Sequence, residues 1–558
     1  MNLKEFNNLI DLYFYQAKKE NSNTPFLEWL NPKNKKKYTW GETSTSIQKL
    51  AEVLKKNLTE GDRCLLVSEN RPEWLIADIA VMNAGGITVP IFTTYASDDY
   101  EYIVNDCNPS LVIISNNIQF KKIKRFIENK NIISFEKLEI DSILVEEVFK
   151  ENKKDEKKHN LKRNSSACII YTSGTTGNPK GVVLSHGGIL SNCEGAMKIL
   201  KPLIKKDPIF LTWLPLSHSY EHTVQFIQIL VGAQIFYAES LEKLITNMSD
   251  SQPTIMTAVP RFYQNLYNKI SLNFSKLEGL KKKLITNTLK LGTKKLKKEN
   301  LNFVEKISNF LCEILVRKKI KKQFGGELQA FVSGGGALDQ KIGEFLNSIG
   351  LPTLQGYGLT EASPVVSCNV PGNIQIETVG PPFKTNEVKI SNDGEILVKG
   401  ENVMLGYWNQ PEETKNAIKE GWLYTGDIGK FNNQYLKITD RKKDIIVNAG
   451  GDNISPLKIE NLLTNQKEIE QCLVYGDKKN YLIALIVPSE EYLNNVSEIK
   501  KKIEDINKDL SITEKIKKFH LIDKKFSIDN RMLTPTLKLK RFEIIKNYKK
   551  EIEKIYLK

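Results

Sequence analysis

The chain has 558 residues, of which 40% are hydrophobic and 26% charged, and this composition excludes a wholly disordered protein. Lys and Arg number 81 against 66 Asp and Glu, and the net charge of +15 favours nucleic acid, a membrane surface or a phosphorylated ligand as partner. The seven cysteines form no C-x-x-C pair, so we expect neither a structural zinc nor a disulfide scaffold and favour a reducing cytoplasm. We expect no signal peptide, and the most apolar window, 75–92, is interrupted too often for a membrane-spanning helix.

The first third of the chain alternates helical and strand-like patterns. The predicted elements are a helix through Leu3, Phe6, Ile10 and Phe14, buried strands at 64–68 and 111–114, a helix over 74–83 followed by a strand, and a strand at 167–171. Such alternation predicts parallel sheets covered by helices. The charged residues 150–163 are expected to form an exposed connection, and the last 120 residues a smaller α/β unit with a Lys-rich helical tail.

Residues 269–322 form a basic segment that is predicted to be helical. It holds 16 Lys and Arg against 4 Glu, a net charge of +12, which is most of the charge of the whole chain. The leucines at roughly helical spacing are Leu277, Leu280, Leu284 and Leu291. Two interpretations stay open: a basic face with a leucine stripe that lies on an anionic membrane, or a solvated helical hairpin with its leucines in the core.

A loop rich in glycine and hydroxyl groups follows the strand at 167–171. Its candidate phosphate-binding residues are Thr172, Ser173, Gly174, Thr175, Thr176, Gly177 and Lys180. Glycines let backbone N–H groups approach phosphate oxygens, hydroxyls add donors, and a lysine supplies a compact positive charge. The sequence does not fit the Walker A pattern.

Further polar residues fit the parts of a nucleotide. Tyr357 can stack on a flat base, Thr360 can donate to a phosphate, and Glu361 offers a hard oxygen ligand for Mg²⁺ shared with ATP phosphates. Asp427, on a Thr-Gly-Asp turn, can accept both ribose hydroxyls, the alternative being a carboxylate that stabilises the turn. Arg441 can hold the ribose or a phosphate, the alternative being a surface salt bridge.

Six motifs, in this order along the chain, resemble those of the adenylate-forming superfamily, which includes acyl-CoA synthetases, firefly luciferase and peptide-synthetase adenylation domains. They lie at 171–182, 333–337, 355–361, 424–429, 439–444 and 534–541. The resemblance covers nearly the whole chain. It implies an α/β fold, with an N-terminal domain (1–440) of two αβ-layered subdomains and a β-barrel-like subdomain, and a small mobile α+β C-terminal domain (441–558).

The same resemblance implies roles for individual residues. The nucleotide-binding residues would include Gly335, Gly336, Ala337, Gln355, Gly356, Gly358, Asp427 and Arg441, with Thr172 and Glu361 on the metal. Lys538 would reach the α-phosphate and the acyl carboxylate, although Leu537 stands where the family usually has glycine; the alternative is an ordinary lysine of a basic tail. Lys443 would be the hinge, and Gly450 and Gly451 would belong to the loop on the CoA side.

One short pattern points to a different chemistry. His218, Glu221 and His222 match H-x-x-E-H, an inverted zincin pattern that predicts a zinc hydrolase. The residues just before it resemble instead the motif in which His218 borders the acyl site. We favour the second interpretation, because no further zinc ligand is evident and five-residue patterns arise easily by chance.

The motifs together predict an ATP-dependent long-chain fatty acid:CoA ligase, which forms acyl-AMP and then a thioester, with Mg²⁺ as cofactor and ATP and CoA as co-substrates. The hinge motif at 439–444 and the basic insertion at 269–322 resemble the long-chain branch. The alternatives are a ligase for medium-chain or aryl acids, an acyl-AMP ligase serving a carrier protein, and a basic nucleic-acid-binding protein. Against the last alternative, the sequence contains no finger or RNP signature. We expect a cytoplasmic protein, with peripheral contact at the inner membrane face if the basic segment binds lipid.

Overall fold

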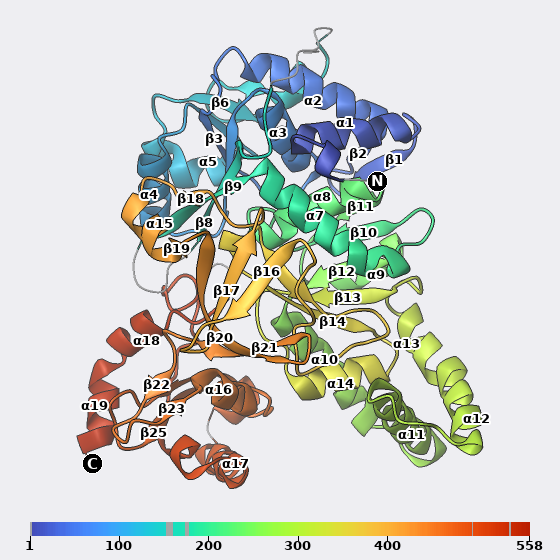
Figure 1. Ribbon diagram of the computed structural model, residues 1–558, viewed down its shortest axis with the longest axis vertical. Coiled ribbons are helices and arrows are strands. Elements are labelled where there is room, and N and C mark those ends of the chain that lie inside the picture. Colours follow the sequence, from blue (N-terminus) through green and yellow to red (C-terminus); the bar gives the residue numbers. More distant parts are fainter. Residues whose placement is uncertain (1–2, 152–159, 173–177, 494, 535–536, 558) are drawn as a thin grey trace.

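The computed structural model describes residues 3–151, 160–172, 178–493, 495–534 and 537–557 (Figure 1). Residues 173–177 of the predicted phosphate loop and most of the charged connection lie outside the described residues.

One eight-stranded sheet forms the upper part of the N-terminal domain. The order is β18 (Gly406–Tyr407), β9 (Lys180–Ser185), β8 (Ser166–Thr172), β4 (Ile87–Ile91), β3 (Arg63–Val67), β5 (Leu111–Ile114), β6 (Asn131–Ser134) and β7 (Ile143–Leu144). The strands from β8 to β7 are parallel, and β9 and β18 add an antiparallel edge. The predicted strands at 64–68, 111–114 and 167–171 are therefore confirmed, as is the helix at 74–83, which is α3 (Pro72–Asn83).

A second eight-stranded sheet follows in the chain. Its order is β15 (Val365–Cys368), β14 (Thr353–Gly358), β13 (Ala330–Ser333), β12 (Ile255–Ala258), β10 (Ile209–Thr212), β11 (Gln234–Tyr237), β1 (Pro25–Trp29) and β2 (Lys37–Thr39). Only the edge strands β15 and β2 are antiparallel to their neighbours. The predicted helix–strand alternation thus gives two mainly parallel sheets.

Helices fill the space between the sheets and cover their outer faces. The largest apolar cluster joins alternate residues of both sheets to the middle-layer helices α1 (Leu9–Lys19), α2 (Trp40–Leu54), α3, α7 (His186–Leu200) and α8 (Ser219–Leu230). Because side chains alternate along a strand, Leu66 faces this middle layer while Leu65 faces α4 (Ser97–Cys107) and α5 (Asn117–Ile123). On the other sheet Phe331 faces α10 (Pro260–Ser275) and α14 (Gln340–Ser348). The result is five alternating layers of helix and sheet.

A third, antiparallel sheet supplies the β-barrel-like subdomain. It consists of β16 (Asn386–Ile390), β17 (Glu395–Gly400), β20 (Trp422–Asn432), β19 (Ile418–Lys419) and β21 (Tyr435–Arg441). Asp427 on β20 lies directly opposite Arg441 on β21 in the ladder. This pairing brings together two residues that are 14 positions apart in the sequence.

The C-terminal region is a separate α+β unit below this sheet in Figure 1. Its core sheet is β24 (Ile469–Tyr475), β25 (Leu482–Pro488) and β26 (Ile516–Leu521), and a small hairpin joins β22 (Ile446–Val447) to β23 (Asn453–Ile454). The helices are α16 (Pro456–Thr464), α17 (Val496–Lys508), α18 (Arg541–Asn547) and α19 (Lys549–Leu557). The predicted fold class is confirmed.

The basic segment forms a projecting arm at the lower right of Figure 1. It comprises α11 (Gly279–Leu296), α12 (Phe303–Cys312), the π-helical turn η4 (Glu313–Arg317) and α13 (Lys318–Lys322). The predicted leucines do not form one stripe: Leu277 precedes α11 and Leu280 is exposed, whereas Leu284 packs against the apolar core and Leu291 is buried, as the core interpretation expected of them. None of the described helices is long and apolar enough to span a bilayer.

Candidate active site

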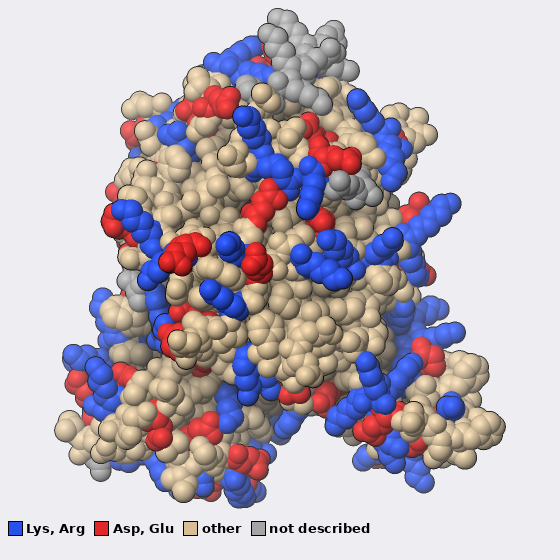
Figure 2. All heavy atoms as spheres, viewed as in Figure 1, with Lys and Arg blue, Asp and Glu red and all other residues tan. Residues whose placement is uncertain are grey.

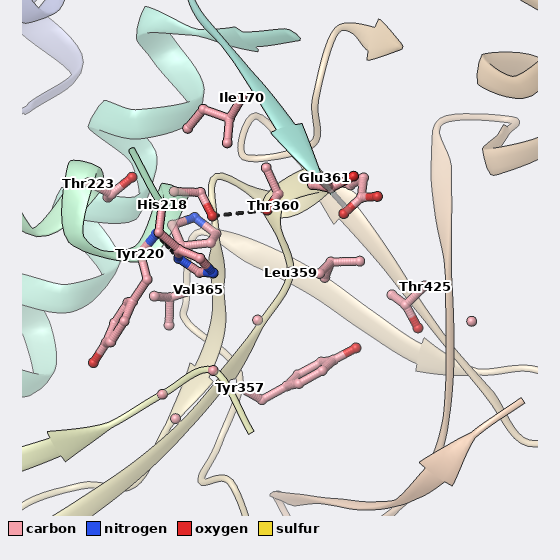
Figure 3. Close-up of a pocket in the computed structure, with 18 of the residues that line it drawn as sticks. Ile170, His218, Tyr220, Thr223, Tyr357, Leu359, Thr360, Glu361, Val365 and Thr425 are labelled. Carbon is pink, nitrogen blue, oxygen red and sulfur yellow. Dashed lines mark hydrogen bonds between the residues drawn. The ribbon is translucent and has the colours of Figure 1, made fainter. Parts of the chain in front are cut away.

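A cavity of about 790 Å³ lies where both eight-stranded sheets, the antiparallel sheet and the C-terminal unit meet. Its walls include the carboxyl ends of β8, β13 and β14, the first turn of α8, and residues after β21. Figure 3 shows His218, Thr360 and Glu361 around the same space, with Tyr357 below them. In parallel sheets the strand ends leave such a crevice open for a ligand.

The loop after β13 brings the backbone close to the cavity. Gly334 and Gly335 line it, and Gly335 has a φ of +79°, a conformation that glycine adopts at no steric cost. A Cβ on Gly334 would lie 2.8 Å from the ring of Tyr220, so glycine allows this ring to pack against the loop. The Tyr220 hydroxyl donates to Val332 O at 3.1 Å and fixes the ring.

Asp427 is buried and held by two partners that line the cavity. The Tyr357 hydroxyl donates to its Oδ2 at 2.7 Å, and Arg441 Nε lies 3.0 Å from its Oδ1. The charge of Asp427 raises the pKa of Arg441. These contacts join the motif around Tyr357 to the antiparallel sheet, so that Tyr357 and Arg441, linked through Asp427, form a polar wall of the cavity.

Glu361, Thr360 and Thr172 provide oxygen atoms at the other side of the cavity. The Tyr407 hydroxyl donates to Glu361 Oε1 at 2.9 Å, and that bond uses one carboxylate oxygen. The described residues hold no group of three or more His, Cys, Asp and Glu that would ligate a metal by themselves. One carboxylate with hydroxyls does fit Mg²⁺ that also binds phosphate oxygens and water.

His218 caps the N-terminus of α8 and faces the cavity. Its Nδ1 accepts a hydrogen bond from the Tyr220 backbone N–H at 3.1 Å, so the neutral ring carries its proton on Nε2. Burial, and then the positive charge of Lys538, lower the pKa of His218 to about 4. The side chain is therefore a neutral hydrogen-bond donor at physiological pH.

Lys538 reaches the same cavity from the C-terminal unit. Its backbone N–H donates to Thr534 Oγ1 at 3.0 Å, and the preceding Leu537 has a φ of +62°. Although part of its surface is exposed, removal of water by the cavity walls, and then the charge of Arg441, lower the pKa of Lys538 to about 8. The negative charges of Asp427 and Glu361 raise the pKa of Lys538 and so partly offset this lowering.

Two further lysines of the motifs are held by carboxylates. Lys180, on β9, pairs with Glu413 of α15 (Pro411–Ala417) and faces the Tyr407 ring at 5.0 Å. Lys442 pairs with Asp393 at 2.6 Å and with Glu395 at 2.9 Å. The hydrogen bond from Lys442 lowers the pKa of Asp393 to about 2, and the two pairs tie the start of the C-terminal unit to the antiparallel sheet.

The structure brings most of the predicted residues together, but not all. The described ones that line the cavity are Thr172, Lys180, His218, Gly335, Gly356, Tyr357, Gly358, Thr360, Glu361, Arg441, Lys443 and Lys538. Gly336, Ala337, Gln355 and Asp427 do not line the cavity themselves, although Asp427 is bonded to the lining residues Tyr357 and Arg441. Gly450 and Gly451 are exposed on the β22–β23 loop, where Asn448 Oδ1 accepts the Gly450 N–H at 2.9 Å.

The three side chains of the H-x-x-E-H pattern point to separate partners. His222 Nε2 lies 2.8 Å from Asp78 Oδ2 in the core, and Thr257 Oγ1 donates to Glu221 Oε2 at 2.7 Å. His218 alone lines the cavity. A zinc ion needs several of these side chains at one point, so this geometry does not fit the zinc interpretation.

The cavity continues in an apolar arm that the sequence motifs did not predict. Its walls are Ala196, Ile199 and Leu200 on α7, Val224 and Ile227 on α8, Phe210 on β10 and Ile255 on β12. These positions are ordinary core positions in the sequence pattern. Only the packing of α7 and α8 against the second sheet turns them into the lining of an empty space beside His218.

Comparisons with known proteins agree with this architecture. The family model described as AMP-binding enzyme matches residues 14–408, and the AMP-binding enzyme C-terminal domain matches 443–558. The chain is 28% identical to the long-chain-fatty-acid–CoA ligase FadD15 of Mycobacterium bovis, covering 93% of this chain and 92% of that protein. It is 30% identical to the long-chain-fatty-acid–CoA ligase 5 of Rattus norvegicus, covering 88% and 79%. The structure of O-succinylbenzoate coenzyme A synthetase from Bacillus subtilis, solved with ATP and magnesium ion, matches with a TM-score of 0.71 at 20% identity, covering 96% and 99%.

Two layered subdomains, an antiparallel sheet and a small C-terminal unit lie around one cavity, and the family models that match 14–408 and 443–558 identify this architecture as that of an adenylate-forming enzyme. The chain belongs to the AMP-binding enzyme family, as its motifs indicated. Within that family it is an ATP-dependent enzyme of the acid–CoA ligase class.

Proposed function

We propose that the protein is a long-chain fatty acid:CoA ligase that works through an acyl-AMP intermediate. The observation that carries this proposal is the apolar arm of the cavity, which suits a hydrocarbon chain and offers it no charged side chain. An alkyl chain gains about 0.8 kcal/mol for each buried CH₂ group, so a deep arm favours long acids over short ones. The names of the curated relatives support the same substrate.

The polar end of the cavity then binds ATP. Tyr357 stacks on or beside the base, and Asp427 accepts the ribose hydroxyls, exchanging its bonds to Tyr357 and Arg441 for bonds to the nucleotide. The phosphates lie toward Thr360 and Lys180. His218 donates from Nε2 to the acid group and orients its carboxylate.

Lys538 acts in the first half-reaction. A carboxylate oxygen of the acid attacks the α-phosphorus of ATP, the bond from that phosphorus to the bridging oxygen breaks, and pyrophosphate leaves. Negative charge builds up between the two anions, and the ammonium of Lys538 stabilises it. The neutral His218 ring adds a hydrogen-bond donor and, being uncharged, does not repel the ammonium of Lys538.

Glu361 and Thr172 would hold Mg²⁺ together with the phosphates of ATP. When bound, the ion neutralises phosphate charge and orients the leaving group. The hydrogen bond from Tyr407 to Glu361 keeps the carboxylate turned toward the cavity.

The second half-reaction requires a different arrangement of the C-terminal unit. We infer that this unit, residues 441–558, rotates about Lys443, withdraws Lys538 and brings Gly450 and Gly451 to the cavity for CoA. The CoA sulfur then attacks the acyl carbon, the bond to the AMP oxygen breaks, and the thiol proton is released. The exposed position of Lys443 suits a hinge, which must absorb large changes of backbone angles.

The environment of the protein is part of the proposal. All seven cysteines lie among the described residues and are free and buried, which supports a reducing compartment such as the cytoplasm. We place the enzyme at the inner face of a membrane, where fatty acids partition.

A ligase assay with acids from C2 to C18 and with aryl acids tests the proposed function. We expect ATP-dependent release of pyrophosphate and AMP with CoA as acceptor, and the highest kcat/KM for long chains. A preference for an aryl or a short acid would refute the long-chain assignment, and acyl-AMP without thioester would indicate an acyl-AMP ligase.

A further inference from the structure

The projecting helical segment formed by α11, α12, η4 and α13, which is separate from the apolar arm of the cavity, presents an apolar face to solvent. The exposed residues of this α12 apolar face are Phe303, Val304, Ile307, Phe310, Leu311, Ile314 and Leu315. Phe303 is 77% exposed and Phe310 is 64% exposed. Contiguous exposed apolar side chains on a folded protein mark a contact surface. None of these residues lines the cavity, so the active site does not account for them.

The helix is fixed in this orientation by polar contacts on its inner side. Asn287 Nδ2 donates to Ser308 Oγ at 2.5 Å, and Lys294 pairs with Glu305 at 2.6 Å. The buried guanidinium of Arg317 donates to Ser348 O at 2.9 Å and to Thr288 O at 3.2 Å. Rotating the helix to bury its phenylalanines would break these bonds, so the apolar face stays outside.

Positive charge surrounds the α12 apolar face. Exposed lysines of the same helical stretch are Lys306, Lys318, Lys319 and Lys322, and α11 adds Lys281, Lys282 and Lys283. Of the three acidic residues between 279 and 322, Glu305 is paired with Lys294, Glu313 lies 3.3 Å from Arg317, and Glu299 is exposed between α11 and α12. Figure 2 shows blue side chains beside uncharged surface on this arm at the lower right.

We propose that the α12 apolar face and its lysines form a docking surface for an anionic lipid bilayer. An exposed apolar stripe with cations at its edges fits the boundary between anionic headgroups and acyl chains. There the apolar side chains are buried among the acyl chains, and the lysines are attracted to the headgroups. Nucleic acid or an acidic protein would use the lysines and leave the phenylalanines without a role. The surface lies on the membrane, because none of the described helices can cross it.

This inference deepens the proposed function, since it assigns the residues by which the enzyme would meet the membrane that holds its substrate. The full chain is mixed with vesicles of equal parts phosphatidylcholine and phosphatidylglycerol, or of phosphatidylcholine alone, and sedimented. We expect binding to the anionic vesicles that weakens as salt concentration rises. Phe303→Asn combined with Phe310→Asn should reduce partitioning at least about tenfold, and neutralising Lys306, Lys318 and Lys319 to Gln about fivefold for each lysine.

Ile118→Asn is the matched control. Ile118 on α5 is 68% exposed and, like the phenylalanines of α12, is an apolar side chain on a helix that also carries lysines, here Lys121 and Lys122. The control variant should bind vesicles like the unchanged protein. A second readout uses Phe310→Cys carrying an environment-sensitive fluorophore, which labels selectively because the seven native cysteines are buried. Emission should shift to the blue with anionic vesicles for this label, and not for the same label on Ile118→Cys.

The outcomes separate the surface from the reaction. Unchanged vesicle binding in the Phe303/Phe310 variant overturns the proposal, as does an absence of binding by the unchanged protein. A concentration-dependent dimer that this variant converts to monomer, without vesicle binding, would identify a second copy as the occupant and also overturn it. Ligase activity on a long-chain acid supplied in detergent, without vesicles, should be equal in all variants. Its absence in the unchanged protein and in every variant, while the unchanged protein still binds anionic vesicles, would refute the proposed function and leave the docking surface standing.

Discussion

Asp98 on α4 and Arg531 of the C-terminal unit form an ion pair of 2.6 Å between carboxylate and guanidinium. They are 433 residues apart, and both are exposed. A second contact, from Asn465 Nδ2 to Asp339 Oδ2 at 2.7 Å, joins the two parts elsewhere. These contacts accompany the arrangement in which Lys538 reaches the cavity.

Reversing one charge of this pair should favour the other arrangement. We expect Arg531→Asp to lower the rate of ATP–pyrophosphate exchange relative to thioester formation from supplied acyl-AMP by about two- to fivefold, since exposed ion pairs are weak. Adding Asp98→Arg should restore the ratio. Lys508→Asp, which breaks a pair within α17, is the control; an equal effect there would refute a specific role of Arg531.

Replacing Lys538 separates the two half-reactions. Lys538→Ala should lower acyl-AMP formation by at least about 100-fold, because the cation that faces the two reacting anions is lost. Thioester formation from supplied acyl-AMP should persist. Lys540→Ala is the matched control, since Lys540 is two residues away and does not line the cavity. Equal loss in both half-reactions would contradict the assignment.

The lowered pKa of Lys538 predicts a pH dependence. Lysine is active here as the ammonium, and its pKa of about 8 lies below the ordinary value of 10.5, so the active form is lost as pH rises through 8. For adenylation, kcat/KM for ATP should therefore decline above pH 8, by about tenfold per pH unit. Lys538→Arg should remove this decline, because arginine stays charged. A flat profile for the unchanged enzyme would show that Lys538 does not titrate in this step.

Filling the apolar arm should shorten the preferred acid. Ala196→Phe adds a ring to the wall of the arm and should lower kcat/KM for long acids at least about tenfold, while short acids react normally. Lys198→Phe introduces the same side chain on the exposed side of α7 and should change neither. If the Ala196 variant lost activity on all acids equally, the arm would not be the acyl site.

The backbone at Leu537 predicts a tolerance for glycine. A φ of +62° costs a residue with a Cβ about 1–2 kcal/mol, and the side chain is exposed. We expect Leu537→Gly to keep or increase the adenylation rate and Leu537→Val to reduce it, because a β-branched residue fits this conformation least. Loss of adenylation with glycine would show that the leucine side chain itself is needed.

Local patterns were enough to predict the elements that surround the site. The strand at 167–171 and the helix at 74–83 follow from short runs of apolar residues, because the spacing of such residues can be read from adjacent positions in the sequence alone. The basic segment was harder, because a leucine spacing does not say where a helix begins. Leu280 falls in the first turn of α11 and is exposed, whereas Leu291 packs inward.

The sequence by itself determined the family, the layered α/β fold and the chemical groups available for a nucleotide, since these are encoded in contiguous motifs. Only the tertiary structure decided which groups meet. The pairing of Lys180 with Glu413, the apolar arm and the outward face of α12 all depend on contacts between different elements of the fold. Apolar residues at helical spacing look alike in a sequence, and their packing partners decide whether they form core, cavity wall or exposed surface.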